Sequence, residues 1–112
     1  MSRDDRLLFE DMVSSCRKII RYAHGLTFEQ FLADEKTFDA ILRHLMVLGE
    51  AAKLVPTDVR ERYPAIPWRR IAGLRDVAIH RYFGLDEEIL WDVVEREVPA
   101  LLPLVEAMLA SS

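Results

Sequence analysis

The sequence predicts an all-α protein that folds as an up-and-down bundle of four to five helices. Apolar residues recur at steps of three and four along most of the 112 residues, which is the spacing of one face of an α-helix. No stretch of useful length alternates between apolar and polar residues, as a half-buried β-strand would. A chain of this length can build one hydrophobic core but not two, so residues 1–112 are expected to form a single domain.

The first half of the chain is expected to hold two long helices with a short one between them. Residues 4–23 suit one amphipathic helix, and Gly25 follows its last turn as a C-terminal capping residue would. Residues 27–30, Thr-Phe-Glu-Gln, have the spacing of a capping box and predict the start of the short helix. The second long helix is expected over residues 37–54, because Pro56 cannot continue it.

The second half is expected to begin with a brief turn at residues 57–63. Pro67 then suits the first position of a helix over residues 67–82, where its missing N–H is not needed. Asp86 is expected to cap a fourth helix that ends near residue 97.

The C-terminal segment is apolar and contains two prolines, which leaves its start open. One alternative is a helix that begins at Pro99 and contains a strained Pro103. The other is a helix that begins nearer Leu102.

The composition is that of a soluble globular protein in a reducing compartment. Hydrophobic residues make up 51% of the chain and charged residues 30%, and no apolar run is long enough to span a membrane. The first residues lack the apolar stretch of a signal peptide, and the single cysteine, Cys16, cannot form an internal disulfide. We therefore expect a cytoplasmic protein that makes no membrane contact.

The net charge limits how the chain could bind nucleic acid, and the apolar content indicates a second subunit. A net charge of −4 argues against an extended phosphate-binding surface, because such surfaces need many Lys and Arg contacts. Any nucleic-acid chemistry is expected at a small local site. The apolar content is high for so small a bundle, so part of the surface is expected to be buried between subunits of a homodimer.

The segment from Arg75 to Tyr82 holds the side chains most suited to chemistry. Asp76 and His80 are four residues apart and share one helix face, so the carboxylate is placed to orient the imidazole. Arg75 and Tyr82 are seven residues apart and lie together on one helix stripe, next to the stripe of Asp76 and His80. Arg75 and His80 are five apart, about 140° around a helix axis. For both to reach one phosphate, we expect a composite site at a dimer interface.

The spacing Arg-x4-His-x-Tyr resembles the signature of HepT-like proteins of the HEPN superfamily. Three further segments carry the resemblance, which runs from about residue 3 to residue 109: Gly49-Glu50-Ala51-Ala52-Lys53, Ile66 to Leu74, and Tyr82 to Asp86 with Trp91 beyond it. One position departs from the pattern, because many HEPN ribonucleases have Asn directly after the Arg where this chain has Asp76.

The resemblance implies a metal-independent endoribonuclease that needs no cofactor. His80 would act as general base on a ribose 2′-hydroxyl, and Arg75 would hold the scissile phosphate, giving a 2′,3′-cyclic phosphate. It also implies the toxin of a toxin–antitoxin pair, silenced when an MntA-like nucleotidyltransferase antitoxin transfers AMP to Tyr82. The residues themselves predict no metal site, because the three histidines are scattered and no cysteine pair exists.

Four further residues are assigned supporting roles. Glu50 is expected to tune the site by contacting Arg75 across the bundle, although an ordinary solvated or salt-bridged glutamate is the alternative. Arg69, Arg70 and Arg81 flank the motif and are expected to bind RNA, with a solvated helix face as the alternative.

Two rival functions stay open at this point. In the first, the chain is a non-catalytic subunit that docks a nucleotidyltransferase and presents nucleotide or substrate, with Arg75 as a phosphate clamp. In the second, it is a helical scaffold without a site. Loss of activity on His80→Ala would distinguish an enzyme from either.

Overall fold

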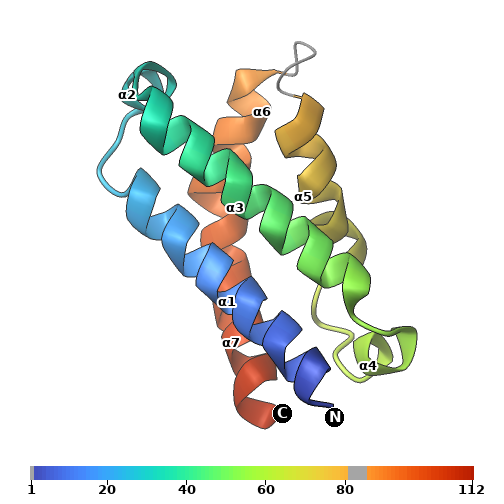
Figure 1. Ribbon diagram of the computed structural model, residues 1–112. Coiled ribbons are helices and arrows are strands. Elements are labelled where there is room, and N and C mark those ends of the chain that lie inside the picture. The colour runs from blue at the N-terminus through green and yellow to red at the C-terminus, as the bar shows by residue number, and fades with distance from the viewer. Residues whose placement is uncertain (1, 81–85) are drawn as a thin grey trace.

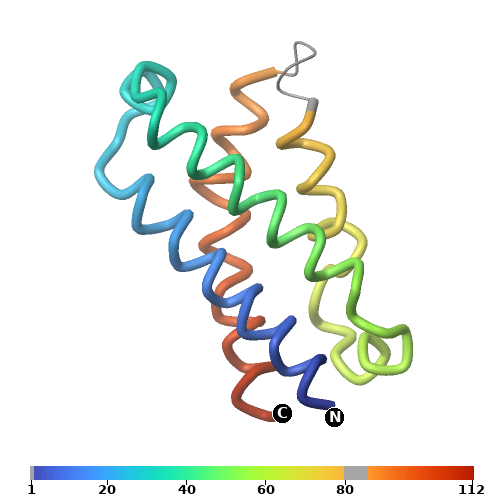
Figure 2. Tube along the Cα trace, in the orientation of Figure 1, coloured from blue at the N-terminus to red at the C-terminus, as the bar shows by residue number. Residues whose placement is uncertain are grey.

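The computed structural model describes residues 2–80 and 86–112, and of His80 only the backbone. Those residues form an all-α bundle, as the sequence predicts, in which the long helices run alternately up and down (Figure 1). Short helices join the long ones at the ends of the bundle (Figure 2). In chain order the elements are α1 (Arg3–Ala23), α2 (Phe28–Ala33), α3 (Glu35–Leu54), α4 (Thr57–Glu61), α5 (Trp68–His80), α6 (Glu87–Asp92), η2 (Val93–Glu97) and α7 (Val98–Ser111).

Helix α3 is the centre of the bundle, because it packs against α1 on one side and α5 on the other, while α7 packs against α1. The predicted apolar stripes of these helices meet in one core. Its largest fully buried side chains include Phe9, Met12 and Ile19 of α1, Ile41, Leu45 and Leu48 of α3, Ile71 of α5, and Met108 of α7. Cys16 lies in this core and is fully buried.

Polar side chains begin the helices where the sequence indicates. Thr27 and Gln30 form the predicted capping box, with each side chain bonded to the other's backbone N–H at 3.1 and 2.9 Å. Asp86 caps α6 by accepting from the Glu88 N–H at 2.8 Å. Asp34 caps α3 through the Thr37 N–H at 3.2 Å, so this helix begins at Glu35, two residues earlier than predicted.

The start of α5 is fixed by a tryptophan. Trp68 Nε1 donates to the carbonyl oxygens of Arg60 and Tyr63 at 3.2 and 3.1 Å, which ties the corner after α4 to the first turn of α5. The helix begins at Trp68, one residue after the predicted start at Pro67. It is described as far as His80, so the predicted last turn, residues 81–82, lies outside the described residues.

The C-terminal segment follows the first of the two predicted alternatives. Helix α7 begins at Val98, one residue before Pro99, and contains Pro103, so a start nearer Leu102 is wrong. It is not a separate helix, however, because α6, η2 and α7 follow one another without a break. The π turn at η2 gives the physical reason: the Val98 N–H bonds to the Val93 carbonyl five residues back. This wider turn precedes Pro99 and relieves the clash between a proline ring and the carbonyl of the preceding turn. Pro103 is accommodated inside α7 on its exposed side.

Among the described residues, no helix is both long and apolar enough to cross a membrane.

Candidate functional site

The site begins with an unusually close contact between α3 and α5. Gly49 of α3 is buried against the backbone of α5 at Arg75. A Cβ atom at position 49 would lie 2.8 Å from the Arg75 nitrogen and 2.9 Å from the Arg75 Cβ. Only a residue without a side chain permits this approach, so Gly49 sets the position of the Arg75 backbone.

The next residue of α3 holds the Arg75 side chain. Arg75 Nε lies 2.7 Å from Glu50 Oε1, and the two side chains are 37% and 46% exposed. Solvent screens a pair so exposed, so it contributes only about 0–1 kcal/mol to stability. Its effect is to orient the guanidinium, which has five N–H donors and keeps some for a second anion. The structure therefore brings Glu50 and Arg75 into the predicted contact, and the tuning of the site by Glu50 stays a prediction.

The remaining motif residues are placed only in part. Helix α5 is regular through His80, so positions 75 and 80 lie about 140° apart around its axis. Asp76 is exposed. The His80 side chain and both Arg81 and Tyr82 lie outside the described residues, and so does the predicted contact between Asp76 and His80.

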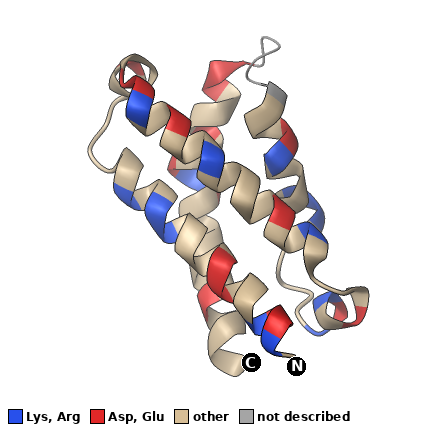
Figure 3. Ribbon diagram, viewed as in Figure 1, with Lys and Arg blue, Asp and Glu red and all other residues tan. Residues whose placement is uncertain are grey.

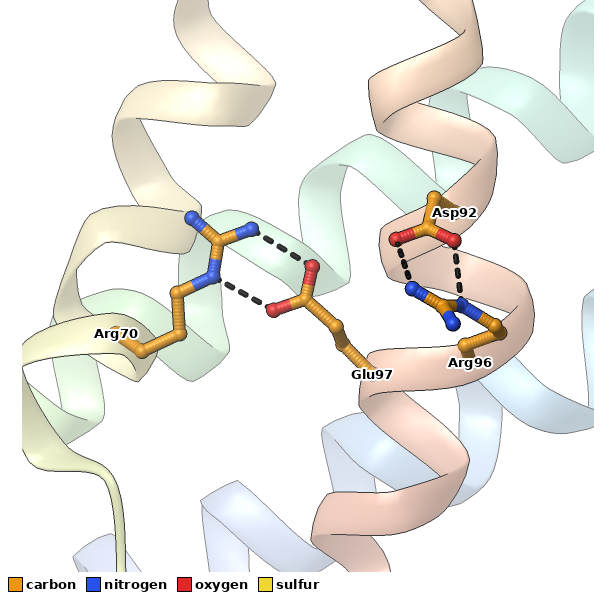
Figure 4. Close-up of polar contacts among 4 residues, drawn as sticks. All are labelled: Arg70, Asp92, Arg96 and Glu97. Atoms are coloured by element: carbon orange, nitrogen blue, oxygen red, sulfur yellow. Dashed lines mark hydrogen bonds and ion pairs between the residues drawn. The ribbon is translucent and has the colours of Figure 1, made fainter.

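The two flanking arginines at the start of α5 differ in their surroundings. Arg70 is paired with Glu97 of η2 through two short contacts, Nε to Oε1 at 2.6 Å and Nη2 to Oε2 at 2.7 Å (Figure 4). The hydrogen bond to Glu97 raises the pKa of Arg70 above its ordinary value. Arg69 is exposed and forms no ion pair within the described part of the chain. Of the two, Arg69 has the guanidinium that is open to an anion, whereas Arg70 joins α5 to the C-terminal helix.

Sequence reasoning missed a second group of cations, which we call the basic cluster: Lys18 and Arg21 of α1 with Arg43 of α3. The three surround His44 and, together with its burial as the larger cause, lower the pKa of its imidazole. The Tyr22 ring lies 5.8 Å from the His44 ring. Figure 3 shows Lys and Arg segments on adjacent stretches of these helices. The spacing on α1 was visible in the sequence, but the register of α1 against α3 was not.

A groove of about 520 Å³ follows α3 between Glu50 and the basic cluster. Its lining is mainly apolar and includes Leu8, Leu42, Met46, Val47, Ala51, Leu54 and Ala78, with Asp11, Asp39 and Arg43 also contributing. Several large apolar side chains on this face are exposed, Leu54 most of all at 63%. This groove reaches Glu50, the residue that holds Arg75.

Residues 2–80 and 86–112 hold no group of three or more His, Cys, Asp and Glu placed to share a metal ion.

Comparison with known proteins places the chain in a family. Residues 12–108 match the model of a family described as ribonuclease HepT-like. A Methanocaldococcus jannaschii protein described as a "putative RNase" is 40% identical over 107 residues, which are 96% of this chain and 88% of that protein. A Thermococcus cleftensis protein described as a "probable ribonuclease HepT" is 40% identical over 101 residues, 90% of this chain and 92% of that protein. No solved structure matches. The chain therefore belongs to the ribonuclease HepT-like family of the HEPN superfamily, as its Arg-x4-His-x-Tyr motif and Gly49-Glu50 segment predicted.

Proposed function

We propose that this protein is a metal-independent endoribonuclease whose site is formed by Arg75 and His80. Family membership supports ribonuclease activity. The observation that carries the assignment to this site is the placement of Arg75, whose backbone is set by Gly49 and whose guanidinium is oriented by Glu50. A cation held in this way, half-exposed and next to a groove, is suited to bind a phosphate without reorganisation.

The chemistry follows from the two side chains. His80 removes the proton of the ribose 2′-hydroxyl, and the 2′-oxygen attacks the adjacent phosphorus. The bond between phosphorus and the 5′-oxygen breaks, and that oxygen takes up a proton from water. The products are a 2′,3′-cyclic phosphate and a 5′-hydroxyl. Arg75 stabilises the negative charge that develops on the phosphoryl oxygens. Asp76 orients the His80 imidazole, and Arg69 and Arg81 contribute positive charge beside the motif.

We further propose that the active unit is a homodimer. Positions 75 and 80 point to different sides of a regular helix, so one phosphate is reached most readily by Arg75 of one subunit and His80 of the other. The groove along α3 is a suitable interface, because Val47 and Leu54 expose apolar surface there next to the Arg75–Glu50 pair. A second copy of the chain would cover this surface.

The regulatory part of the proposal concerns Tyr82. In a toxin–antitoxin pair of the HepT/MntA type, a nucleotidyltransferase antitoxin would transfer AMP from ATP to the Tyr82 hydroxyl and release pyrophosphate. The bulky anionic adduct would occupy the site and pair with the Arg75 cation, which lies on the same helical stripe two turns earlier. Intact-mass and fragment-mass analysis after coexpression tests this step, and AMP on any other residue would refute it.

The first experiment is cleavage of total RNA by the purified chain in EDTA, after mass spectrometry has shown that Tyr82 is unmodified. His80→Ala and Arg75→Ala are expected to lose cleavage, and the products of the wild type are expected to carry cyclic-phosphate ends. His24→Ala is the matched control, since His24 is exposed at the end of α1. It should cleave as the wild type does.

Two outcomes would redirect the assignment. Cleavage that persists in His80→Ala would remove His80 from the reaction. If the unmodified wild type cleaves nothing, the non-catalytic subunit becomes the better description, with Arg75 as a phosphate clamp for a nucleotidyltransferase partner.

A further inference from the structure

The cations of the basic cluster form no ion pair with a carboxylate within the described part of the chain, although Asp39 lies one turn before Arg43 on α3. Five arginines elsewhere on the surface are paired with carboxylates at 2.6–3.4 Å: Arg6, Arg17, Arg70, Arg75 and Arg96. Lys18, Arg21 and Arg43 form no such pair. Gathering like charges costs free energy, and the three cations add to the effect of burial, the larger cause, in lowering the pKa of His44. In a chain with a net charge of −4, this arrangement indicates an anionic ligand that the chain does not itself supply.

Aromatic rings lie among these cations. The Tyr22 and His44 rings are 5.8 Å apart and tilted by 49°, and the Arg21 guanidinium lies 5.3 Å from the centre of the Tyr22 ring. Both rings are half-buried, so each has one part fixed by packing and another open to solvent. Cations interleaved with aromatic faces are the surface on which single-stranded nucleic acid binds, through its phosphates and its stacked bases.

The cluster lies on the same face of α3 as the site around Arg75. Arg43 and Glu50 are seven residues apart, so they project from one stripe about 10.5 Å apart along the helix axis. Both line the groove described above, and Glu50 holds Arg75. The groove between them also carries Asp11 and Asp39, which disfavour phosphate there. Phosphates are therefore expected at the two ends of the groove, at Arg43 and at Arg75, and the strand between them would run along the edge of the proposed interface with the second copy.

We propose that the basic cluster is a second binding site for the RNA substrate. It would bind backbone phosphates of single-stranded RNA a short distance along the strand from the bond cleaved at Arg75, with a base stacked on Tyr22. This inference rests on the proposed ribonuclease function and adds to it a determinant of substrate length. A short substrate that ends before the cluster is cleaved with the same turnover but gains no affinity from it.

The test compares two double variants in the non-cleaving His80→Ala background. Arg21→Gln/Arg43→Gln removes two cations of the cluster. Arg3→Gln/Arg62→Gln removes the same charge from the opposite end of the bundle, near the N-terminus and α4 (Figure 1). Affinity for a fluorescein-labelled single-stranded RNA of about a dozen nucleotides is measured by anisotropy over a series of salt concentrations, and folding is checked by thermal unfolding.

The cluster variant is expected to bind roughly 3- to 30-fold more weakly, as the loss of two exposed charge contacts implies. Its log–log salt slope should shrink by about 1.4, since each phosphate contact to a single strand contributes about 0.7. The control variant should keep the wild-type slope. RNA should also raise the pKa of His44, followed by NMR, because phosphates offset the surrounding cations.

Cleavage assays separate this inference from the function on which it rests. With His80 restored, the cluster variant should raise KM for long RNA and leave kcat and trinucleotide cleavage unchanged. Normal cleavage by the wild type with equal RNA affinity in both double variants would overturn the cluster and leave the ribonuclease intact. If the cluster variant keeps its RNA affinity but no longer binds the nucleotidyltransferase antitoxin, the RNA-binding role of the basic cluster would also be overturned. The cluster would then be a binding site for an acidic protein. RNA binding lost in the cluster variant alone would support it even if the wild type cleaves nothing.

Discussion

Replacing Gly49 with alanine tests how far the packing of α3 determines the site on α5. The new Cβ would lie 2.8 Å from the Arg75 nitrogen, about 0.6 Å inside the shortest ordinary contact of 3.4 Å, and 3.2 Å from the Ala72 carbonyl oxygen. Two of its three nearest atoms belong to the backbone of α5, so the clash cannot be relieved by rotating a side chain. The two helices must separate or slide.

Gly73→Ala provides a matched control for the energetics. Gly73 lies inside α5 as Gly49 lies inside α3, but a Cβ there would meet nothing within 4 Å. Both substitutions gain the higher helix propensity of alanine, about 1 kcal/mol, so this contribution cancels when the two are compared. What remains is the overpacking of Gly49→Ala, roughly 1–3 kcal/mol. Gly73→Ala should therefore be more stable than the wild type, and Gly49→Ala less stable than Gly73→Ala by that amount.

Thermal unfolding and RNA cleavage are the two assays. A difference of about 1 kcal/mol corresponds to about 4–8 °C in melting temperature for a domain of this size. Cleavage by Gly49→Ala, corrected for the folded fraction, should fall on the order of 10- to 100-fold, because small displacements of a phosphate-binding group cost that much. Gly73→Ala should cleave normally. Equal stability of the two variants, or full activity in Gly49→Ala, would refute the argument that this contact positions Arg75.

Three further predictions concern the surface and the core. Val47→Glu/Leu54→Glu, which places charge on the exposed apolar face of α3, should give monomers by light scattering that keep the helical circular dichroism of the wild type and do not cleave RNA. Dimers that persist would place the interface elsewhere. Burial and the basic cluster lower the folded-state pKa of His44, so its contribution to stability is present above the unfolded pKa of about 6.5 and is lost as the pH falls through the folded pKa. The free energy of unfolding should therefore decline more between pH 7 and pH 5 in the wild type than in His44→Gln, and equal declines would contradict this. Burial, and secondarily Glu106, raise the pKa of the Cys16 thiol to about 12, so a thiol reagent at pH 8 should react with the unfolded chain and not with the folded one.

The helices could be predicted because their determinants are local. The capping box at Thr27 and the cap at Asp86 satisfy backbone groups within three residues, and both are found as predicted. The junction before the C-terminal helix could not be predicted in the same way. Whether Pro99 starts a helix depends on the preceding turn, and the π turn at Val93–Glu97 is held in place by packing and by the Arg70–Glu97 pair from α5. Neither the packing nor the Arg70–Glu97 pair can be inferred from the residues around Pro99.

The site shows the same division between local and tertiary information. The seven-residue spacing between positions 75 and 82 is local and was visible in the sequence. The Arg75–Glu50 pair joins residues 25 apart in the sequence, so it depends on the register between α3 and α5. Glu50 was singled out only because its segment resembles that of a family. The cluster around His44 belongs to no recognised pattern. Arg43 follows Arg21 by 22 residues in the sequence, so only the structure reveals that it joins the two cations of α1.

These contacts make α3, rather than the helix that bears the motif, the element that organises the site. Gly49 fixes the backbone of Arg75 and Glu50 orients its guanidinium, while Arg43, two turns earlier on the same helix, reaches the basic cluster. Substitutions at the end of α3 near Gly49 should therefore act on the chemical step and lower kcat. Substitutions near Arg43 should act on RNA affinity and raise KM. A single helix would then link where the RNA is held to where it is cut, because a rigid α-helix keeps the two points at a constant separation.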